Sequence, residues 1–195
     1  MTPPRKAMVL AAGLGKRMRP ITDTMPKPLV RIGGSTLLDR GLDMLAAAGV
    51  EEAIVNVHYL GDQIARHVAL RAKPRITISD ESAQLLDSAG GIVKALPLLG
   101  RDPFFVLNAD TFWIDSGEPD LGRLALAWDA RRMDILLMLA DIADTTGHTG
   151  GTDFLIDGES RLARAKGAPE GLVYAGAAIV HPRIFAGAAS GPHSL

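Results

Sequence analysis

The chain has 195 residues, and 47% of them are apolar, which is enough to bury one hydrophobic core. Its 21 basic and 22 acidic side chains nearly cancel, so no global positive field favours nucleic acid or an anionic membrane surface. The lack of cysteine excludes disulfides and thiolate metal sites. The first apolar run, residues 7–12, is too short for a signal-peptide core or a membrane span, and we expect a cytoplasmic protein.

The first predicted element is a strand over residues 7–12, and it leads into a long basic loop. Gly13 and Gly15 remove side chains where backbone N–H groups could approach phosphate oxygens, and Arg17 adds positive charge. Ligands of open α/β sheets bind at the carboxyl ends of the strands, which is where this loop begins. A dinucleotide-binding fingerprint would need a glycine where Met18 stands, and the P-loop pattern GxxxxGK[ST] is absent. By itself, the glycine pair is a weak sign of an anion site.

Beyond the loop, segments with helical periodicity alternate with short apolar runs. We predict helices over residues 35–50, 61–72, 90–100 and 120–132, and strands over residues 52–58, 75–79, 103–110 and 133–140. Ser35 or Thr36 can cap the first of these helices. The alternation predicts an α/β fold with a Rossmann-like, doubly wound, mostly parallel sheet and helices on both of its faces.

After residue 140 the pattern changes to short β-like pieces separated by turns. The Asp157–Gly158 pair is typical of a hairpin turn, and a further strand is predicted over residues 173–182. We interpret residues 140–182 as a β-rich flap over the edge of the sheet, on its sugar side, within a single domain that spans residues 1–195. The last ten residues have no apolar face, and we expect them to be poorly ordered.

The basic loop and several later blocks together resemble the sugar-phosphate nucleotidylyltransferases. The pattern GxGxRxxPxTxxxPKP of that family is matched at Gly13, Gly15, Arg17, Pro20, Thr22, Pro26, Lys27 and Pro28. Similar blocks follow at residues 55–64, 85–100, 106–110 and 174–179, so the resemblance spans nearly the whole sequence. Within the family, VNVHYL, NADTFW and an acidic-x-x-GGI turn are most similar to the branch that transfers a uridylyl group to N-acetylmuramate 1-phosphate. The fold implied is that of the nucleotide-diphospho-sugar transferases.

The resemblance implies an enzyme that joins a nucleoside triphosphate, UTP in that branch, to a sugar 1-phosphate and releases pyrophosphate, for recycling of cell-wall peptidoglycan. It implies that Arg17 holds the departing pyrophosphate and that Lys27 bridges the α-phosphate and the sugar phosphate. Asp110 follows an apolar strand, and the resemblance makes it a ligand of Mg²⁺. Since a few hydrogen bonds decide the choice of base, mannose 1-phosphate guanylyltransferase and glucose 1-phosphate thymidylyltransferase stay open as alternatives.

The resemblance also assigns residues to the two substrates. The expected nucleotide contacts are Ala11, Ala12, Gly13, Gly15, Glu81, Asp87 and Gly90. The expected sugar contacts are Asn108, Asp153, Tyr174 and Gly176.

One feature of the family is missing from this sequence. Members carry a late turn of the type [DN]-x-G-T-P, whose first residue supplies a second metal contact, and none follows Tyr174. We therefore expect a chain shortened relative to the family, and a second hypothesis is a truncated relative that binds nucleotide without turnover. The intact set of Arg17, Lys27 and Asp110 favours the enzyme, because a pure binder has no need of it. The sequence does not indicate an oligomeric state.

Overall fold

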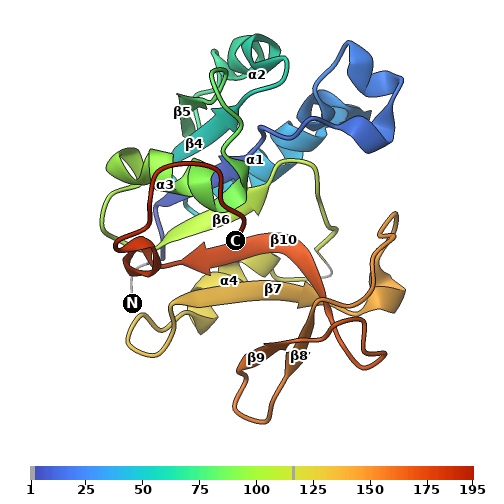
Figure 1. Cartoon of the computed structure of the whole chain (residues 1–195), viewed down its shortest axis with the longest axis vertical. Helices are drawn as coiled ribbons and strands as arrows, with labels where there is room; N and C mark the ends of the chain where they lie inside the picture. The colour runs from blue at the N-terminus through green and yellow to red at the C-terminus, as the bar shows by residue number, and fades with distance from the viewer. Residues whose placement is uncertain (1–2, 116) are drawn as a thin grey trace.

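The computed structural model describes residues 3–115 and 117–195. Within these residues the main sheet has the strand order β5-β4-β1-β6-β10-β7 (Figure 1). Its strands are β1 (Lys6–Leu10), β4 (Glu52–Val57), β5 (Arg75–Asp80), β6 (Phe104–Asn108), β7 (Ile135–Ala140) and β10 (Val173–Val180). β1 pairs in parallel with β4 and with β6, and β4 pairs in parallel with β5. The mostly parallel sheet predicted from the sequence is confirmed.

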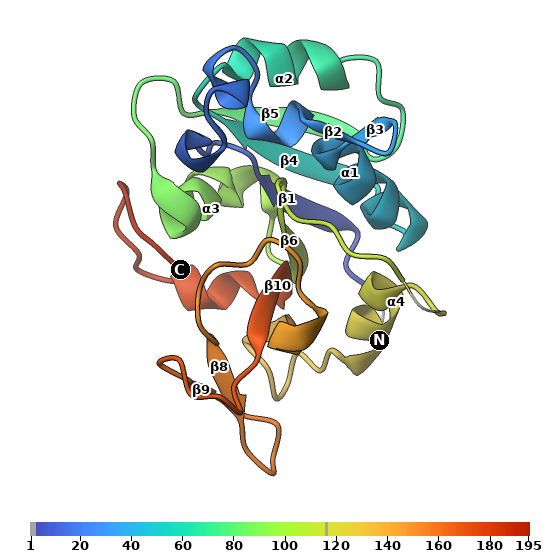
Figure 2. The same cartoon turned by 90° about the vertical axis from the view of Figure 1, so that its right-hand side faces the viewer.

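Helices cover both faces of this sheet, as Figure 2 shows. They are α1 (Leu37–Ala47), α2 (Gly61–Val68), α3 (Asp87–Leu99) and α4 (Asp120–Ala127). Side chains of α1, α2 and α4 pack in one apolar cluster, and those of α3 pack in a second cluster. Because side chains alternate along a strand, Val9 of β1 joins the first cluster and its neighbour Met8 joins the second. The doubly wound arrangement is therefore confirmed.

Helix α1 illustrates how the sequence sets the boundaries of an element. The Thr36 hydroxyl accepts a hydrogen bond from the Asp39 N–H at 2.9 Å, which satisfies a free donor of the first turn. Leu38, Leu42 and Leu45 repeat at helical spacing, and all three are fully buried. The predicted cap at Thr36 is thus confirmed.

Two predictions about the second half of the chain are wrong. β7, expected as a buried parallel strand, is an edge strand that pairs antiparallel with β10. β10 itself, expected in the flap, lies inside the main sheet between β6 and β7 and runs antiparallel to both. The reason is that no crossover helix lies between β7 and β10, so the chain returns in the opposite direction.

What remains of the predicted flap is the segment between β7 and β10. It contains the short turn Ile142–Asp144 and the hairpin of β8 (Phe154–Ile156) and β9 (Leu162–Arg164), which pair antiparallel. The predicted hairpin around Asp157 is therefore confirmed. Figure 1 shows that it projects from the β7 side of the molecule.

After β10 and the short turn Pro182–Phe185, the chain returns to the start of α3. The His193 carbonyl accepts hydrogen bonds from the Ala89 and Gly90 N–H groups at 2.9 and 3.1 Å. The His193 N–H donates to the Leu86 carbonyl at 3.0 Å. The tail that was expected to be poorly ordered instead supplies acceptors to the N–H groups at the start of this helix.

No helix in residues 3–115 and 117–195 combines the length and the apolar character needed to cross a membrane.

Candidate active site

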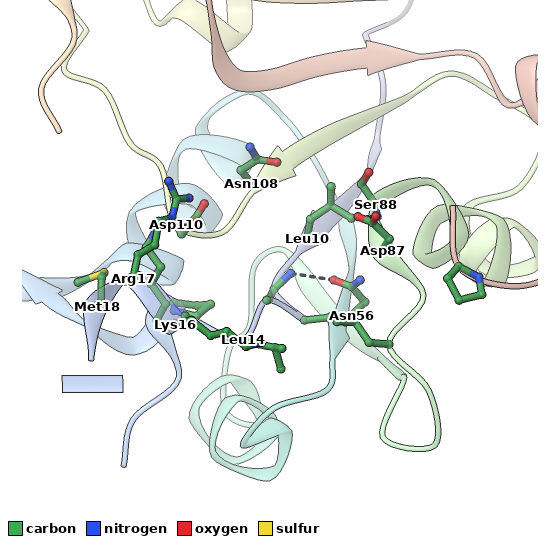
Figure 3. A pocket seen from close by; sticks show the side chains of 18 residues that line it. Leu10, Leu14, Lys16, Arg17, Met18, Asn56, Asp87, Ser88, Asn108 and Asp110 are labelled. Atoms are coloured by element: carbon green, nitrogen blue, oxygen red, sulfur yellow. Dashed lines mark hydrogen bonds and ion pairs between the residues drawn. The ribbon is translucent and has the colours of Figure 1, made fainter. Parts of the chain in front are cut away.

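A cavity of about 750 Å³ lies at the carboxyl ends of β1, β4 and β6, where ligands of open α/β sheets bind (Figure 3). One wall is formed by residues 10–18, from the last residue of β1 into the loop that follows it. Leu85, Asp87 and Ser88 at the start of α3 form the facing wall. Asn56, Asn108, Asp110, Lys27, Pro28 and Pro192 complete the lining.

The loop that follows β1 and carries Gly13 and Gly15 is called the glycine loop below. It has a fixed shape because Gly15 is packed against Thr22. Gly15 has a φ of +62°, in the left-handed region, and a Cβ at this position would lie 3.0 Å from Thr22 Cγ2. Thr22 is fully buried, and its hydroxyl donates a hydrogen bond to the Gly15 carbonyl at 2.8 Å. Gly13 is different, since a Cβ there would meet no atom within 4 Å. Glycine at 15 is therefore needed for the fold of the loop, whereas glycine at 13 leaves open space in the cavity wall.

The block at residues 55–64 supports the loop from the other side. The Tyr59 hydroxyl lies 3.0 Å from the Thr22 carbonyl and 3.1 Å from the Asp23 carbonyl, within hydrogen-bond distance of both. The Gln63 side-chain amide donates to the Thr24 carbonyl at 3.0 Å. These contacts tie the loop to α2, so the cations that it carries are held near the sheet.

The cations and one carboxylate gather on one side of the cavity. Lys27 Nζ lies 2.5 Å from Asp110 Oδ2, and the two side chains are 24% and 37% exposed. Arg17 is exposed and lies on the same side as Asp110, while Asp87 and Ser88 lie on the opposite side (Figure 3). The cavity is therefore polarised, with the positive groups at one end and the start of α3 at the other.

Asp110 is the predicted metal ligand, and its surroundings fit Mg²⁺ that is held jointly with a substrate. The carboxylate follows β6 and lines the cavity. The described part of the chain holds no group of three or more histidine, cysteine or acidic side chains that could bind a metal by themselves. Mg²⁺ is commonly held by one or two carboxylates together with substrate phosphate oxygens, and one half-buried carboxylate that lines the cavity beside Lys27 suits that mode.

Most of the residues predicted from the sequence line this cavity. They are Ala11, Ala12, Gly13, Gly15, Arg17, Lys27, Asp87, Asn108 and Asp110. Asp87 has a φ of +61°, and its carboxylate accepts a hydrogen bond from the Ser88 N–H at 2.7 Å. The residues that the structure brings together thus come from the loop after β1, from the end of β6 and the turn after it, and from the start of α3.

Two residues predicted to contact the nucleotide do not line the cavity. Glu81 is only 1% exposed, and its carboxylate bonds to Asn56 and to the Leu86 N–H instead. Gly90 is buried against the tail, since a Cβ there would lie 2.2 Å from the Gly191 carbonyl oxygen. The structure therefore gives both residues partners within the protein.

The predicted sugar contacts Asp153, Tyr174 and Gly176 do not line the cavity either. Asp153 accepts a hydrogen bond from the Tyr174 N–H at 2.9 Å, and burial raises the pKa of the Tyr174 phenol, so the phenol stays neutral. Gly176 has a φ of +84°, and a Cβ there would lie 3.0 Å from Thr111 Cβ. Tyr174 and Gly176 lie at a register shift of β10, and Gly176 packs against Thr111, the residue that follows Asp110.

Asn56, Lys16 and Ser88 line the cavity but were not identified from the sequence. Asn56 is 2% exposed, and its side-chain oxygen accepts a hydrogen bond from the Ala11 N–H at 2.7 Å (Figure 3). A signal for it was present, because Asn56 is a polar residue inside the apolar run of its strand and close to the carboxyl end.

Comparison with known proteins places the cavity in context. A family model described as nucleotidyl transferase matches residues 6–146. The chain is similar to the N-acetylmuramate alpha-1-phosphate uridylyltransferase of Caulobacter vibrioides, with 50% identity over 98% of this chain and 81% of that protein. It is also 35% identical to the protein of the same name from Neisseria meningitidis, over 95% of this chain and 79% of that one.

The fold has relatives among solved structures. The inositol-1-phosphate CTP transferase from T. maritima superposes with a TM-score of 0.78 at 20% sequence identity, covering 99% of this chain and 78% of that one. The likeness establishes a shared architecture of sheet and helices.

Proposed function

The chain belongs to the nucleotidyl transferase family, and from this premise we propose that it transfers a uridylyl group from UTP to N-acetylmuramate 1-phosphate and releases pyrophosphate. The observation that carries the proposal is the gathering of Arg17, Lys27 and Asp110 around one cavity beside the glycine loop. The choice of UTP and of this sugar rests on the two relatives that bear the corresponding name.

In the proposed reaction an oxygen of the sugar phosphate attacks the α-phosphorus of UTP. A bond forms between them, and the bond from the α-phosphorus to the oxygen bridging to the β-phosphorus breaks. No protein nucleophile is needed, so the protein contributes alignment and neutralisation of charge. Arg17 would donate to the departing pyrophosphate, and Lys27 would donate to the α-phosphate and the incoming sugar phosphate.

Asp110 would hold Mg²⁺ together with phosphate oxygens of the nucleotide. When bound, the ion neutralises negative charge on the triphosphate. The contact between Lys27 Nζ and Asp110 Oδ2 at 2.5 Å supports this assignment, because it means that the lysine and the carboxylate reach the same small volume.

The start of α3 and the glycine loop would enclose the nucleoside. Gly13 leaves space for close approach to the backbone after Ala11 and Ala12, and Asp87 and Ser88 offer polar groups on the facing wall. Asn108 would contact the sugar, and Asp153, Tyr174 and Gly176 would border the sugar subsite from β10 and the flap. The use of a nucleoside triphosphate supports a cytoplasmic location.

A second candidate function is nucleotide binding without turnover. It would use the same cavity and glycine loop but would need neither the transfer step nor the metal role of Asp110. The two candidates differ in one measurement, the release of pyrophosphate from UTP and N-acetylmuramate 1-phosphate in the presence of Mg²⁺. Release that depends on both substrates supports the transferase. A rise in melting temperature with UTP, without pyrophosphate release, supports the binder.

A further inference from the structure

A chain of buried hydrogen bonds runs beneath the cavity from the glycine loop to α3. The Ala11 N–H donates to the Asn56 side-chain oxygen at 2.7 Å. The Asn56 side-chain NH₂ donates to Glu81 Oε1 at 2.7 Å, and the Leu86 N–H donates to Glu81 Oε2 at 3.0 Å. Ala11 lies in one wall of the cavity, and Leu86 immediately precedes α3 in the facing wall. The side chains of Asn56 and Glu81 therefore connect the two walls between which the nucleoside is expected to bind.

The two side chains in this series of hydrogen bonds, those of Asn56 and Glu81, are sealed from solvent. Asn56 is 2% exposed and Glu81 is 1% exposed. Gly91 of α3 packs directly over them, since a Cβ there would lie 2.7 Å from both Asn56 Nδ2 and Glu81 Oε1. A sealed pair of this kind cannot exchange its partners for water, so its geometry is fixed by the protein.

We propose that Glu81 is a positioning residue, which sets the separation of the glycine loop and α3 through Asn56 and so determines the affinity for the nucleotide. The proposal rests on the function proposed above, and it replaces the expected direct contact between Glu81 and the nucleotide. Glu81 does not line the cavity, and both of its carboxylate oxygens already accept hydrogen bonds from the protein.

The order of donors and acceptors explains why a carboxylate is required at this position. Both ends of the chain are backbone N–H groups, at Ala11 and Leu86, and both can only donate. Asn56 accepts at one end and donates at the other, so Glu81 must accept at both of its oxygens. A glutamine side chain has one acceptor, its oxygen, and one donor group, its NH₂. In either orientation of the amide, two donor groups then face each other at one of the three hydrogen bonds. A buried donor without an acceptor is costly.

The same logic identifies a pair of substitutions that restores the pattern. In Asn56→Asp with Glu81→Gln, the aspartate accepts from the Ala11 N–H and from the glutamine NH₂, and the glutamine oxygen accepts from the Leu86 N–H. Every hydrogen bond of the original chain is then possible, with the single negative charge moved to the neighbouring side chain. Neither substitution alone achieves this, because Asn56→Asp places two carboxylates in contact.

The test is the equilibrium binding of UTP by calorimetry, well below the melting temperature of each variant, together with the KM for each substrate. We expect Glu81→Gln to weaken UTP binding about tenfold, which corresponds to about 1.4 kcal/mol, with a much smaller change in the KM for the sugar phosphate. We expect the double variant to bind UTP within about threefold of the unchanged protein. Glu52→Gln is the matched control, because Glu52 begins β4 at the end away from the cavity and should leave binding unchanged.

Each alternative gives a distinct result. UTP binding that Glu81→Gln leaves unchanged would overturn the proposal, as would a double variant that binds as weakly as the single variant or does not fold. If Glu81→Gln shifts the preference among UTP, CTP and GTP without rescue by Asn56→Asp, the carboxylate contacts the base and the proposal is wrong. If Glu81→Gln fails to fold, a folded double variant with normal UTP binding still supports it. Failure of the unchanged protein to bind any nucleotide would remove both this proposal and the proposed function.

Discussion

The two glycines of the loop after β1 should respond in opposite ways to the same substitution. Gly15→Ala places a side chain on a residue with a φ of +62° and a Cβ 3.0 Å from Thr22 Cγ2. Gly13→Ala adds a methyl group that would meet no protein atom within 4 Å, in the wall of the cavity. The first should therefore cost stability, and the second should cost nucleotide binding.

The size of the first effect follows from the backbone. An L-residue in the left-handed region costs about 1–2 kcal/mol relative to glycine, and the tight contact with Thr22 adds to this. In a domain of this size, that loss corresponds to a fall in melting temperature of about 2–8 °C. Gly13→Ala should leave the melting temperature within about 1 °C and weaken UTP binding at least about tenfold, if the nucleotide approaches the backbone there.

Thermal unfolding with and without UTP, followed by calorimetric titration, measures both effects in one set of variants. Gly122→Ala in α4 is a suitable control, since its Cβ would also meet no atom within 4 Å and alanine favours a helix by about 0.5–1 kcal/mol. It should raise the melting temperature slightly without changing UTP binding. If Gly13→Ala binds UTP normally, the nucleotide does not approach the loop at this residue and the assignment of that wall is wrong.

Two further predictions concern catalysis and pH. Lys27→Ala should keep the fold and lower the rate of pyrophosphate release by about 100-fold or more, because it removes a charge beside the α-phosphate; a loss of only a few-fold in the steady-state rate would mean that the role is misassigned. Burial alone would raise the pKa of Asp39, but hydrogen bonds with Thr36 and His67 outweigh it and hold that pKa below its ordinary value. The stability that ionised Asp39 adds to the folded protein is therefore complete above the unfolded-state pKa of about 3.9. It is lost as the pH falls through the lower pKa of the folded state. Denaturant unfolding should show Asp39→Asn destabilised at pH 7 and the difference from the unchanged protein reduced at pH 3; an equal difference at both values would contradict this.

Local sequence patterns were sufficient to predict the parallel strands of the sheet and the side of the cavity that holds Arg17, Lys27 and Asp110. The strand at β1, the glycine loop and Asp110 each carry their signal within a few residues: an apolar run, a pattern of glycine and proline, and a carboxylate at the end of a strand. Residues that follow neighbouring parallel strands lie at the same edge of the sheet, so their positions in the sequence also predict that they are close in space. Arg17, Lys27 and Asp110 accordingly line one cavity.

Tertiary partners decided the features that the sequence did not predict. An apolar run does not reveal strand direction, so the place of β10 between β6 and β7 could not be read from residues 173–182. In the sequence, Glu81 looks like an ordinary surface carboxylate. Its burial depends on Gly91 and Asn56, which pack against it in the folded protein. The tail lacks an apolar face, yet the backbone at the start of α3 provides it with hydrogen-bond donors.

The central claim is that this cavity transfers a uridylyl group to N-acetylmuramate 1-phosphate. The most direct test measures pyrophosphate release with Mg²⁺ while UTP, dTTP, GTP, ATP and CTP are each combined with N-acetylmuramate, N-acetylglucosamine, glucose and mannose 1-phosphates. We predict the highest kcat/KM for UTP with N-acetylmuramate 1-phosphate, and loss of that activity in Lys27→Ala. A higher kcat/KM for GTP with mannose 1-phosphate or for dTTP with glucose 1-phosphate would contradict the substrate assignment, and no release from any pair would contradict the transferase itself.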